Sequence, residues 1–276
     1  MTPAPLPAGA GPPRWPRTLL ATHTAAIYLF LYAPIAVLMA FSFNRARQTA
    51  VWEGFTLSWY GELLHDDRLL RAARNSLLIA VLATGLATLI GTMAALAFAT
   101  PAKPRARGRA VTQVLLLLPV ILPEVVIGAA LLTLFGTLRL RLSLATVLIA
   151  HVVFSISYVA LVVRARLAGL DPALAEAARD LGAGGWEVLR RVTLPLAAPG
   201  IAAGALLVFT LSIDDYVITS FVAGAGATTL PLHVYSLLKS GVTPEVNAVS
   251  TALLAVTVVP IVMAHRLLRR DAGEPA

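Results

Sequence analysis

Three carboxylates stand inside long apolar stretches of this sequence and could do chemistry there. Glu124 is the only charged residue between positions 110 and 138, and Asp214 and Asp215 are the only ones between 192 and 238. An ionised acid at the centre of a membrane costs about 2.5–3.5 kcal/mol on insertion scales, so such residues usually face water or a partner. Carboxylates of this kind could bind a cationic group.

Polar neighbours extend this set of candidates. On a helix, Ser212, Asp215 and Thr219 fall on one face at spacings of three and four, and Asp214 lies about 100° away from it. Glu124 directly follows a proline, and prolines free backbone carbonyls that protein or water must satisfy. We take these five residues as candidates for the wall of a transport path. The alternative, that the acids pair with neighbouring helices or stay protonated, remains open.

Other kinds of site find no support in the sequence. The chain has no cysteine, which excludes disulfides and thiolate metal sites. Neither Lys103 nor Lys239 stands in a G-x-x-x-x-G-K-[ST] frame, so any ATP must be bound by another chain. There is no metal-ligand spacing and no serine-nucleophile elbow, and His151 is expected to be a hydrogen-bonded packing residue. We therefore expect no catalytic residue, metal or cofactor in this chain.

The composition indicates a membrane protein. Hydrophobic residues make up 58% of the 276 residues and charged residues only 13%, whereas a soluble domain carries about a quarter charged residues. The net charge of +8 could suggest nucleic acid, but the basic residues lie mostly in short loops beside apolar runs. The orientation of membrane helices explains them better, so we expect no nucleic-acid partner.

The charge-free stretches predict an all-α membrane protein with about six transmembrane helices, since a span needs about 20 largely apolar residues. Residues 18–268 should form the transmembrane domain, between cytoplasmic tails at 1–17 and 269–276. A cytoplasmic loop is expected at 164–195. The predicted spans are 22–43, 76–100, 111–136, 143–163, 197–221 and 247–266.

The basic residues predict the orientation of the chain in the membrane, and a stripe of small residues predicts a helix-packing surface. With the N-terminus and C-terminus both inside, the inner segments hold most of the 22 Lys and Arg residues, as the positive-inside rule requires. The second predicted span carries a small residue at every fourth position, which allows close approach of helices in lipid. This stripe consists of Ala83, Ala87, Gly91, Ala95 and Ala99.

The cytoplasmic loop reads as two short amphipathic helices. Asp171 suits an N-cap, Pro172 suits the first helical position, and Gly182 can end the helix. A second short helix is expected at 186–192. Periodicity alone also fits a helical hairpin that lies on lipid headgroups. The apolar stripe of the first helix consists of Leu174, Ala177, Ala178 and Leu181.

A longer pattern in this loop is informative. Glu176-Ala177-Ala178 is followed by Gly182, Val192 and Leu194-Pro195 at the spacings of the EAA signature, so the loop resembles that of permease subunits of ABC importers. Val192 stands where the signature usually has isoleucine. The resemblance implies a type I permease fold and a coupling helix seated in a cleft of a separate ATPase. The implied contact residues are Glu176, Ala177, Ala178 and Gly182, supported by Leu174 and Leu181.

Three further stretches indicate a narrower group within this family. Residues 209–215, 230–236 and 241–248 resemble the second permease subunit of spermidine/putrescine importers. That resemblance implies a polyamine substrate, the bacterial inner membrane and alternating access. It also implies three partners: a cytoplasmic ATPase dimer that binds ATP, a second permease in a heterodimer, and a periplasmic solute-binding protein.

Three alternatives stay open at this point. The same architecture could import another small solute. An ion-driven secondary transporter would use the carboxylates as proton or cation sites, but it would leave the EAA-like loop without a role. An intramembrane enzyme or scaffold would need a catalytic constellation, and the sequence shows none.

Overall fold

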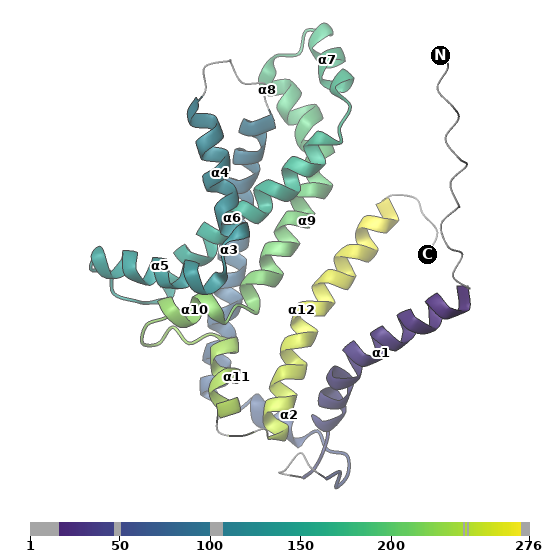
Figure 1. The fold of residues 1–276 in the computed structure, drawn as a ribbon, viewed down its shortest axis with the longest axis vertical. Coiled ribbons are helices and arrows are strands. Elements are labelled where there is room, and N and C mark those ends of the chain that lie inside the picture. The colour runs from purple at the N-terminus through teal and green to yellow at the C-terminus, as the bar shows by residue number, and fades with distance from the viewer. Residues whose placement is uncertain (1–16, 47–50, 100–106, 240, 242, 272–276) are drawn as a thin grey trace, which may run out of the picture.

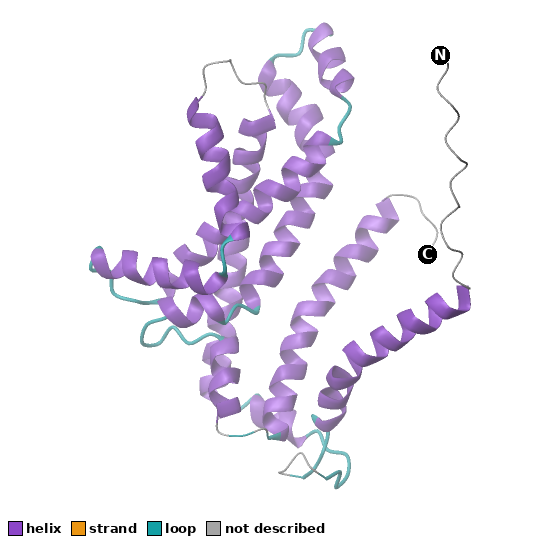
Figure 2. Cartoon of the chain, in the orientation of Figure 1, coloured by secondary structure: helices purple, strands orange, loops and turns teal. Residues whose placement is uncertain are grey.

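Helices are the only regular elements among the described residues, which are 17–46, 51–99, 107–239, 241 and 243–271 of a computed structural model (Figure 2). Within these ranges, Asn44 and Phe55 form an isolated antiparallel bridge. The all-α expectation is therefore confirmed. In chain order, the elements are α1 (Arg17–Phe41), α2 (Ser58–Leu63), α3 (Asp67–Ala99), α4 (Arg107–Ile121), α5 (Glu124–Thr137), α6 (Leu144–Ala168), α7 (Pro172–Asp180), α8 (Gly185–Val188), the π-helical turn η1 (Leu189–Thr193), α9 (Leu194–Ile213), α10 (Val217–Val222), α11 (Leu230–Lys239) and α12 (Pro244–Asp271).

The centre of the structure is a bundle of α3, α6 and α9, which pack against one another (Figure 1). The predicted small-residue stripe lies in these contacts, because Ala83, Ala87 and Ala95 are fully buried. Gly91 faces Val159 of α6, and a Cβ added to Gly91 would lie 2.7 Å from the Val159 Cβ. Ala99, the last residue of the stripe, is exposed. The small residues let the helix backbones approach closely in an apolar medium.

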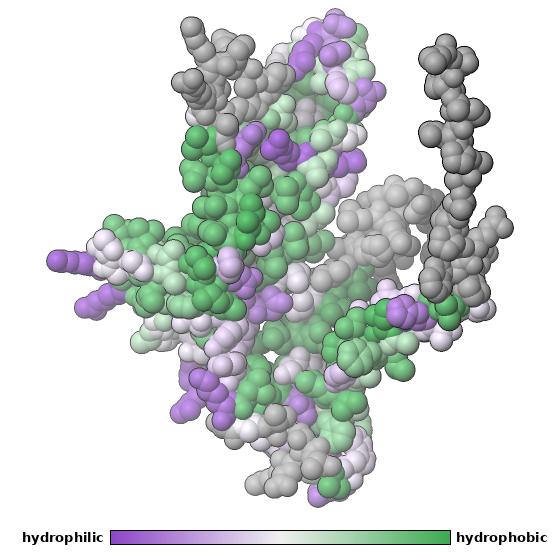
Figure 3. Space-filling view, in the orientation of Figure 1, coloured by the Kyte–Doolittle hydropathy of each residue, from purple (hydrophilic) through white to green (hydrophobic). Residues whose placement is uncertain are grey.

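The apolar helices agree in the main with the predicted spans. Among the described residues, four helical segments are long and apolar enough to cross a membrane: Thr18–Phe41, Asp67–Ala99, Leu144–Ala168 and Gly185–Ile213. A fifth joins them if α4 and α5 count as one span. The sixth predicted span lies within α12, whose 28 residues extend over roughly 42 Å. Figure 3 shows apolar side chains over much of the flank of the bundle, as lipid contact requires.

Two predicted spans are not continuous helices. The expectation of one helix over 111–136 was wrong, because α4 and α5 bend by 114° where Pro123 interrupts the hydrogen bonding. The expectation of one helix over 197–221 was also wrong, because α9 ends at Ile213 and α10 begins only at Val217. As a result α5 and α10 run across the bundle instead of along it (Figure 1).

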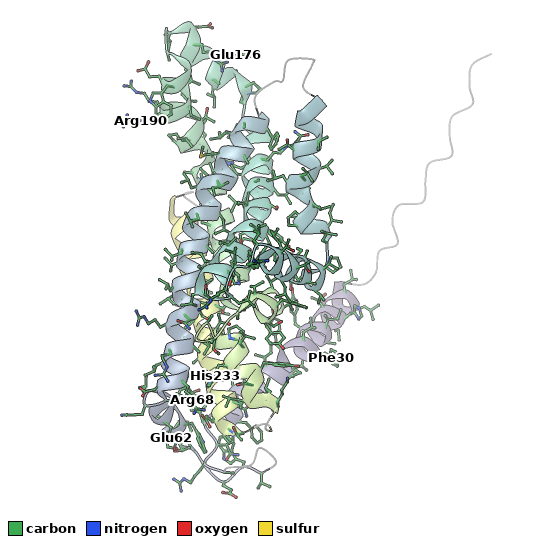
Figure 4. The ribbon with its side chains drawn as sticks, turned by 90° about the vertical axis from the view of Figure 1, so that its left-hand side faces the viewer. Phe30, Glu62, Arg68, Glu176, Arg190 and His233 are labelled. Atoms are coloured by element: carbon green, nitrogen blue, oxygen red, sulfur yellow. The ribbon has the colours of Figure 1, made fainter. Side chains whose placement is uncertain are left out.

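Two helices lie to one side of the central bundle. Helix α1 packs on α12, and α12 contacts α2, α9 and α11 (Figure 1). The most apolar part of α1 has no buried residue, and Phe30 is 80% exposed (Figure 4). Its side chains therefore remain available to lipid or to another membrane subunit.

Gly91→Ala should destabilise the bundle. The new Cβ would lie 2.7 Å from the Val159 Cβ and 2.9 Å from the Ile156 carbonyl oxygen, so we expect a loss of about 1–3 kcal/mol. Gly85→Ala is the matched control on the same helix, because nothing lies within 4 Å of a Cβ at that position. Thermal unfolding in detergent compares the two variants. Equal melting temperatures would contradict the close contact of α3 with α6.

Candidate functional site

The two interrupted helices meet part-way along the bundle. Helix α5 packs on α10, and Gly128 lies so close to Phe221 that an added Cβ would be 2.6 Å from its ring. Each interruption carries an acid: Glu124 is the first residue of α5, and Asp214 caps the C-terminal end of α9. The bundle thus brings together two helix breaks and two carboxylates that the sequence separates widely.

Glu124 and Asp214 are both exposed. Each acid stands at a helix end beside the contact between α5 and α10. At the start of α5 the helix dipole favours the Glu124 charge, whereas at the end of α9 it opposes the Asp214 charge. A cation at this place would therefore gain most from Asp214 and from the unpaired carbonyls at the end of α9.

Asp215 has a different environment from its neighbour. Its side chain is buried and accepts hydrogen bonds from the backbone N–H groups of Ile218 (3.2 Å) and Thr219 (2.8 Å) and from the Thr219 hydroxyl (2.6 Å). Its carboxylate also lies 3.3 Å from the His151 Nε2. The carboxylate therefore caps the first turn of α10 and has its acceptor positions largely filled.

The predicted polar face does assemble, although not on one helix. Ser212, Asp215 and Thr219 converge on His151 of α6 and are buried with it, while Asp214 and Glu124 are exposed. The expectation that His151 is a hydrogen-bonded packing residue is confirmed. A path-lining role for the three buried residues stays a prediction.

An aromatic pair lies beside the interruption between α9 and α10, and no motif in the sequence predicts it. The Tyr216 ring packs against the Tyr235 ring of α11 in a tilted arrangement, with the ring centroids 4.4 Å apart and an interplanar angle of 39°. The Lys239 ammonium lies 5.0 Å from the centroid of the Tyr235 ring. An aromatic face attracts an ammonium ion through its quadrupole. The pairing could not be read from the sequence, because only the fold brings α10 and α11 together.

At one end of the bundle, α7 and α8 form an exposed hairpin (Figure 1). The Asp171 side chain accepts a hydrogen bond from the Ala173 N–H at 2.9 Å, which confirms the predicted N-cap. Gly182 ends the helix with φ of +87°, a conformation that residues with a Cβ rarely adopt. Figure 4 shows Glu176 at the tip of this end, opposite the end that holds Glu62.

The hairpin carries apolar side chains that the described part of the chain leaves exposed. No residue of α7 is buried, Leu181 is 90% exposed, and Leu174 is also exposed. Ala178, Leu181 and Gly182 line a cavity of about 290 Å³ that continues to Glu187 and Arg191. A small partner side chain could enter it. Such an exposed apolar surface beside charged groups is typical of a protein interface.

The second short helix differs from the expectation for 186–192. Only Gly185–Val188 is α-helical, and the π turn Leu189–Thr193 joins it directly to α9. Pro195 lacks an N–H group for the usual α-helical bond, and the wider turn before it accommodates that loss. The hairpin is thus continuous with the long helix α9, so a displacement of the hairpin tip can move α9 as a rigid body.

Comparison with known proteins relates this arrangement to a family. The family described as "Binding-protein-dependent transport system inner membrane component" matches residues 87–270. The spermidine/putrescine transport system permease protein PotC of Escherichia coli (strain K12) is 43% identical over 255 residues, which cover 92% of this chain and 95% of PotC. The putrescine transport system permease protein PotI of the same strain is 41% identical over 251 residues, covering 88% of this chain and 89% of PotI.

A solved structure agrees with the fold. A bacterial ABC transporter involved in the import of the acidic polysaccharide alginate matches with a TM-score of 0.71 over 92% of this chain and 94% of that chain, at 18% identity. The relatives are transport permease subunits, in agreement with the expectation of a non-catalytic chain. The chain belongs to the family of binding-protein-dependent transport system inner membrane components and has the type I permease fold of ABC importers.

Proposed function

We propose that this chain is a permease subunit of an ABC importer for polyamines such as spermidine and putrescine. The observation that carries the proposal is the 43% identity to PotC over 92% of the chain. The exposed carboxylates of Asp214 and Glu124 support it independently. A polyamine carries several ammonium groups, and two neighbouring acids in an apolar bundle are suited to them.

The electrostatics of the break favour a cationic solute. The Asp214 carboxylate stands at the negative end of the α9 dipole, which is unfavourable by about 0.3–1 kcal/mol for an anion near a helix C-terminus. An ammonium group beside Asp214 would offset that cost and would also donate hydrogen bonds to the carbonyl oxygens of the last turn of α9. The Tyr235 ring already holds the Lys239 ammonium close by, so this region of the protein accommodates such groups.

We further propose a cytoplasmic ATPase dimer as the partner of the α7–α8 hairpin, with ATP bound by that partner. The support is the EAA-like pattern Glu176-Ala177-Ala178 together with the exposure of Leu174 and Leu181. In this proposal the small alanines let α7 seat deeply in a cleft. The side chains of Ala178 and Leu181 would contact the ATPase, and Gly182 would let the chain turn back sharply.

Two further partners complete the proposed complex, a second permease subunit in a heterodimer and a periplasmic solute-binding protein. One solved relative is an alginate transporter in complex with its substrate-bound periplasmic protein. The exposed flank of α1 offers a surface for a membrane partner.

The proposed setting is the bacterial inner membrane, with the N-terminus, the C-terminus and the hairpin inside. ATP binding would close the ATPase pair. The hairpin would then turn α9 and change the side of the membrane from which Asp214 is accessible.

The rival solute is suggested by a more distant relative. A putative 2-aminoethylphosphonate transport system permease protein, PhnV of Salmonella typhimurium (strain LT2), is 30% identical over 247 residues. That solute carries an ammonium group and an anionic phosphonate. The exposed acids Glu124 and Asp214 favour a solute with positive charge only, so polyamines fit better.

Asp214→Asn should lower uptake of labelled spermidine at least tenfold while assembly of the transporter is retained. The Asp214 carboxylate is exposed and lies outside the hydrogen-bonded cluster around His151, so its replacement should leave the fold intact, but its charge is needed to attract the ammonium groups. Glu62→Gln is the matched control, because Glu62 is an exposed acid of α2 at the far end (Figure 4). Uptake by the complete transporter in membrane vesicles measures both. Normal uptake by the Asp214 variant would exclude this residue from the path.

Gly182→Asp should abolish uptake and weaken association with the ATPase. A side chain at φ +87° is strained by roughly 1–2 kcal/mol, so the end of α7 would shift. Gly184→Asp introduces the same charge two residues away at an N-cap position with φ of −66°, which aspartate favours, and should retain most activity. Co-purification with the ATPase compares them. If both variants retained the ATPase equally well, the coupling role of this turn would be refuted.

A further inference from the structure

One imidazole connects both sides of the break between α9 and α10. The His151 Nδ1 lies 2.7 Å from the Ser212 hydroxyl in the last turn of α9. The His151 Nε2 lies 2.9 Å from the Thr219 hydroxyl of α10 and 3.3 Å from the Asp215 carboxylate. His151 itself is 1% exposed, and it comes from α6 at the centre of the bundle.

The hydrogen atoms in this cluster have a defined direction. The Thr219 hydroxyl has one proton and donates it to Asp215 at 2.6 Å, so it must accept from the His151 Nε2–H. In the neutral imidazole the Nδ1 is then an acceptor, and the Ser212 hydroxyl donates to it. The result is a chain of hydrogen bonds from α9 through α6 to α10, which runs from the Ser212 hydroxyl through His151 and Thr219 to the Asp215 carboxylate.

Only three residues, 214–216, join the two helices, and Asp214 is the first of them. Because Ser212 and Thr219 are held by the same rigid ring, the relative direction of the two helix ends is fixed by α6. The backbone between these ends cannot rotate freely, so the direction of the Asp214 Cα–Cβ bond is fixed as well. Without the ring, the short linker would leave that direction open.

We propose that His151 is a positioning residue of the substrate path, which acts by holding the α9–α10 break so that Asp214 faces the solute. The consequence for transport rests on the proposed role of Asp214 in polyamine uptake. The positioning itself does not depend on the identity of the solute, so the two claims can be tested apart.

Thiol labelling at position 214 tests the positioning directly. The natural chain has no cysteine, so Asp214→Cys gives it a single thiol that a small cationic methanethiosulfonate reagent can modify in the assembled transporter. We expect His151→Phe to change the labelling rate at 214 at least fivefold. The rate at a Cys substituted for the exposed Glu62 of α2, at the opposite end of the molecule from the hairpin, should stay unchanged (Figure 4).

Thr219 provides a gentler pair of variants in case His151→Phe fails to assemble. Thr219→Val keeps the shape of the side chain but removes the hydroxyl that accepts from His151, and it should change the labelling rate at 214 in the same way. Thr219→Ser keeps the hydroxyl, so the thiol at position 214 should be labelled at the same rate as in the chain that carries Asp214→Cys alone. In chains that retain Asp214, His151→Phe and Thr219→Val should lose uptake, whereas Thr219→Ser should retain it.

Unchanged labelling at 214 in the Thr219→Val variant would overturn the proposal. So would an equal change at 214 and at the Glu62 control position, because that would mark a general disturbance of the fold. If labelling changes as expected but the parent transporter does not take up polyamines, the positioning role stands and the proposed solute is refuted.

Discussion

A helix that stops inside an apolar bundle leaves terminal peptide groups without partners, and no lipid can satisfy them. The rest of this structure depends on how that constraint is met at residues 214–216. Asp215 caps the first turn of α10, and His151 secures Asp215 and Ser212 from the side. Once these buried groups are satisfied, Asp214 is left exposed with its charge available. The two adjacent acids thus differ in environment, because Asp215 is buried and hydrogen-bonded whereas Asp214 is exposed.

The same helix links the break to the far end of the molecule. Helix α9 runs from Leu194 to Ile213, and the π turn joins it to the α7–α8 hairpin without an intervening loop. The buried small residues of α3 and the contact of Gly204 with Val159 let α9 pack tightly on its neighbours. A force on the hairpin would therefore move α9 as a body and change the surroundings of Asp214, instead of being lost in a flexible connection.

Local patterns in the sequence predicted the parts of the fold that local chemistry decides. The charge-free stretches located the long helices, the stripe through Gly91 located a close contact, and Asp171 located the start of α7. The break after Ile213 was missed because no glycine or proline marks it, and its partner His151 lies 61 residues from Ser212 in sequence. Pro123 was noticed, but the 114° bend depends on the packing of α5 against α10. Contacts between side chains of elements that are distant in sequence can be identified only from the tertiary fold.

Uptake of labelled spermidine and putrescine in bacterial cells that lack this gene, with and without the gene restored, tests the central claim most directly. Cells without any other polyamine uptake system should lose uptake and regain it with the restored gene. An excess of unlabelled spermidine should compete, whereas a neutral diol of similar length should not, because in the proposed function Asp214 and Glu124 attract positive charge. Unchanged uptake in the cells that lack the gene would contradict a polyamine importer and leave only the fold and the family.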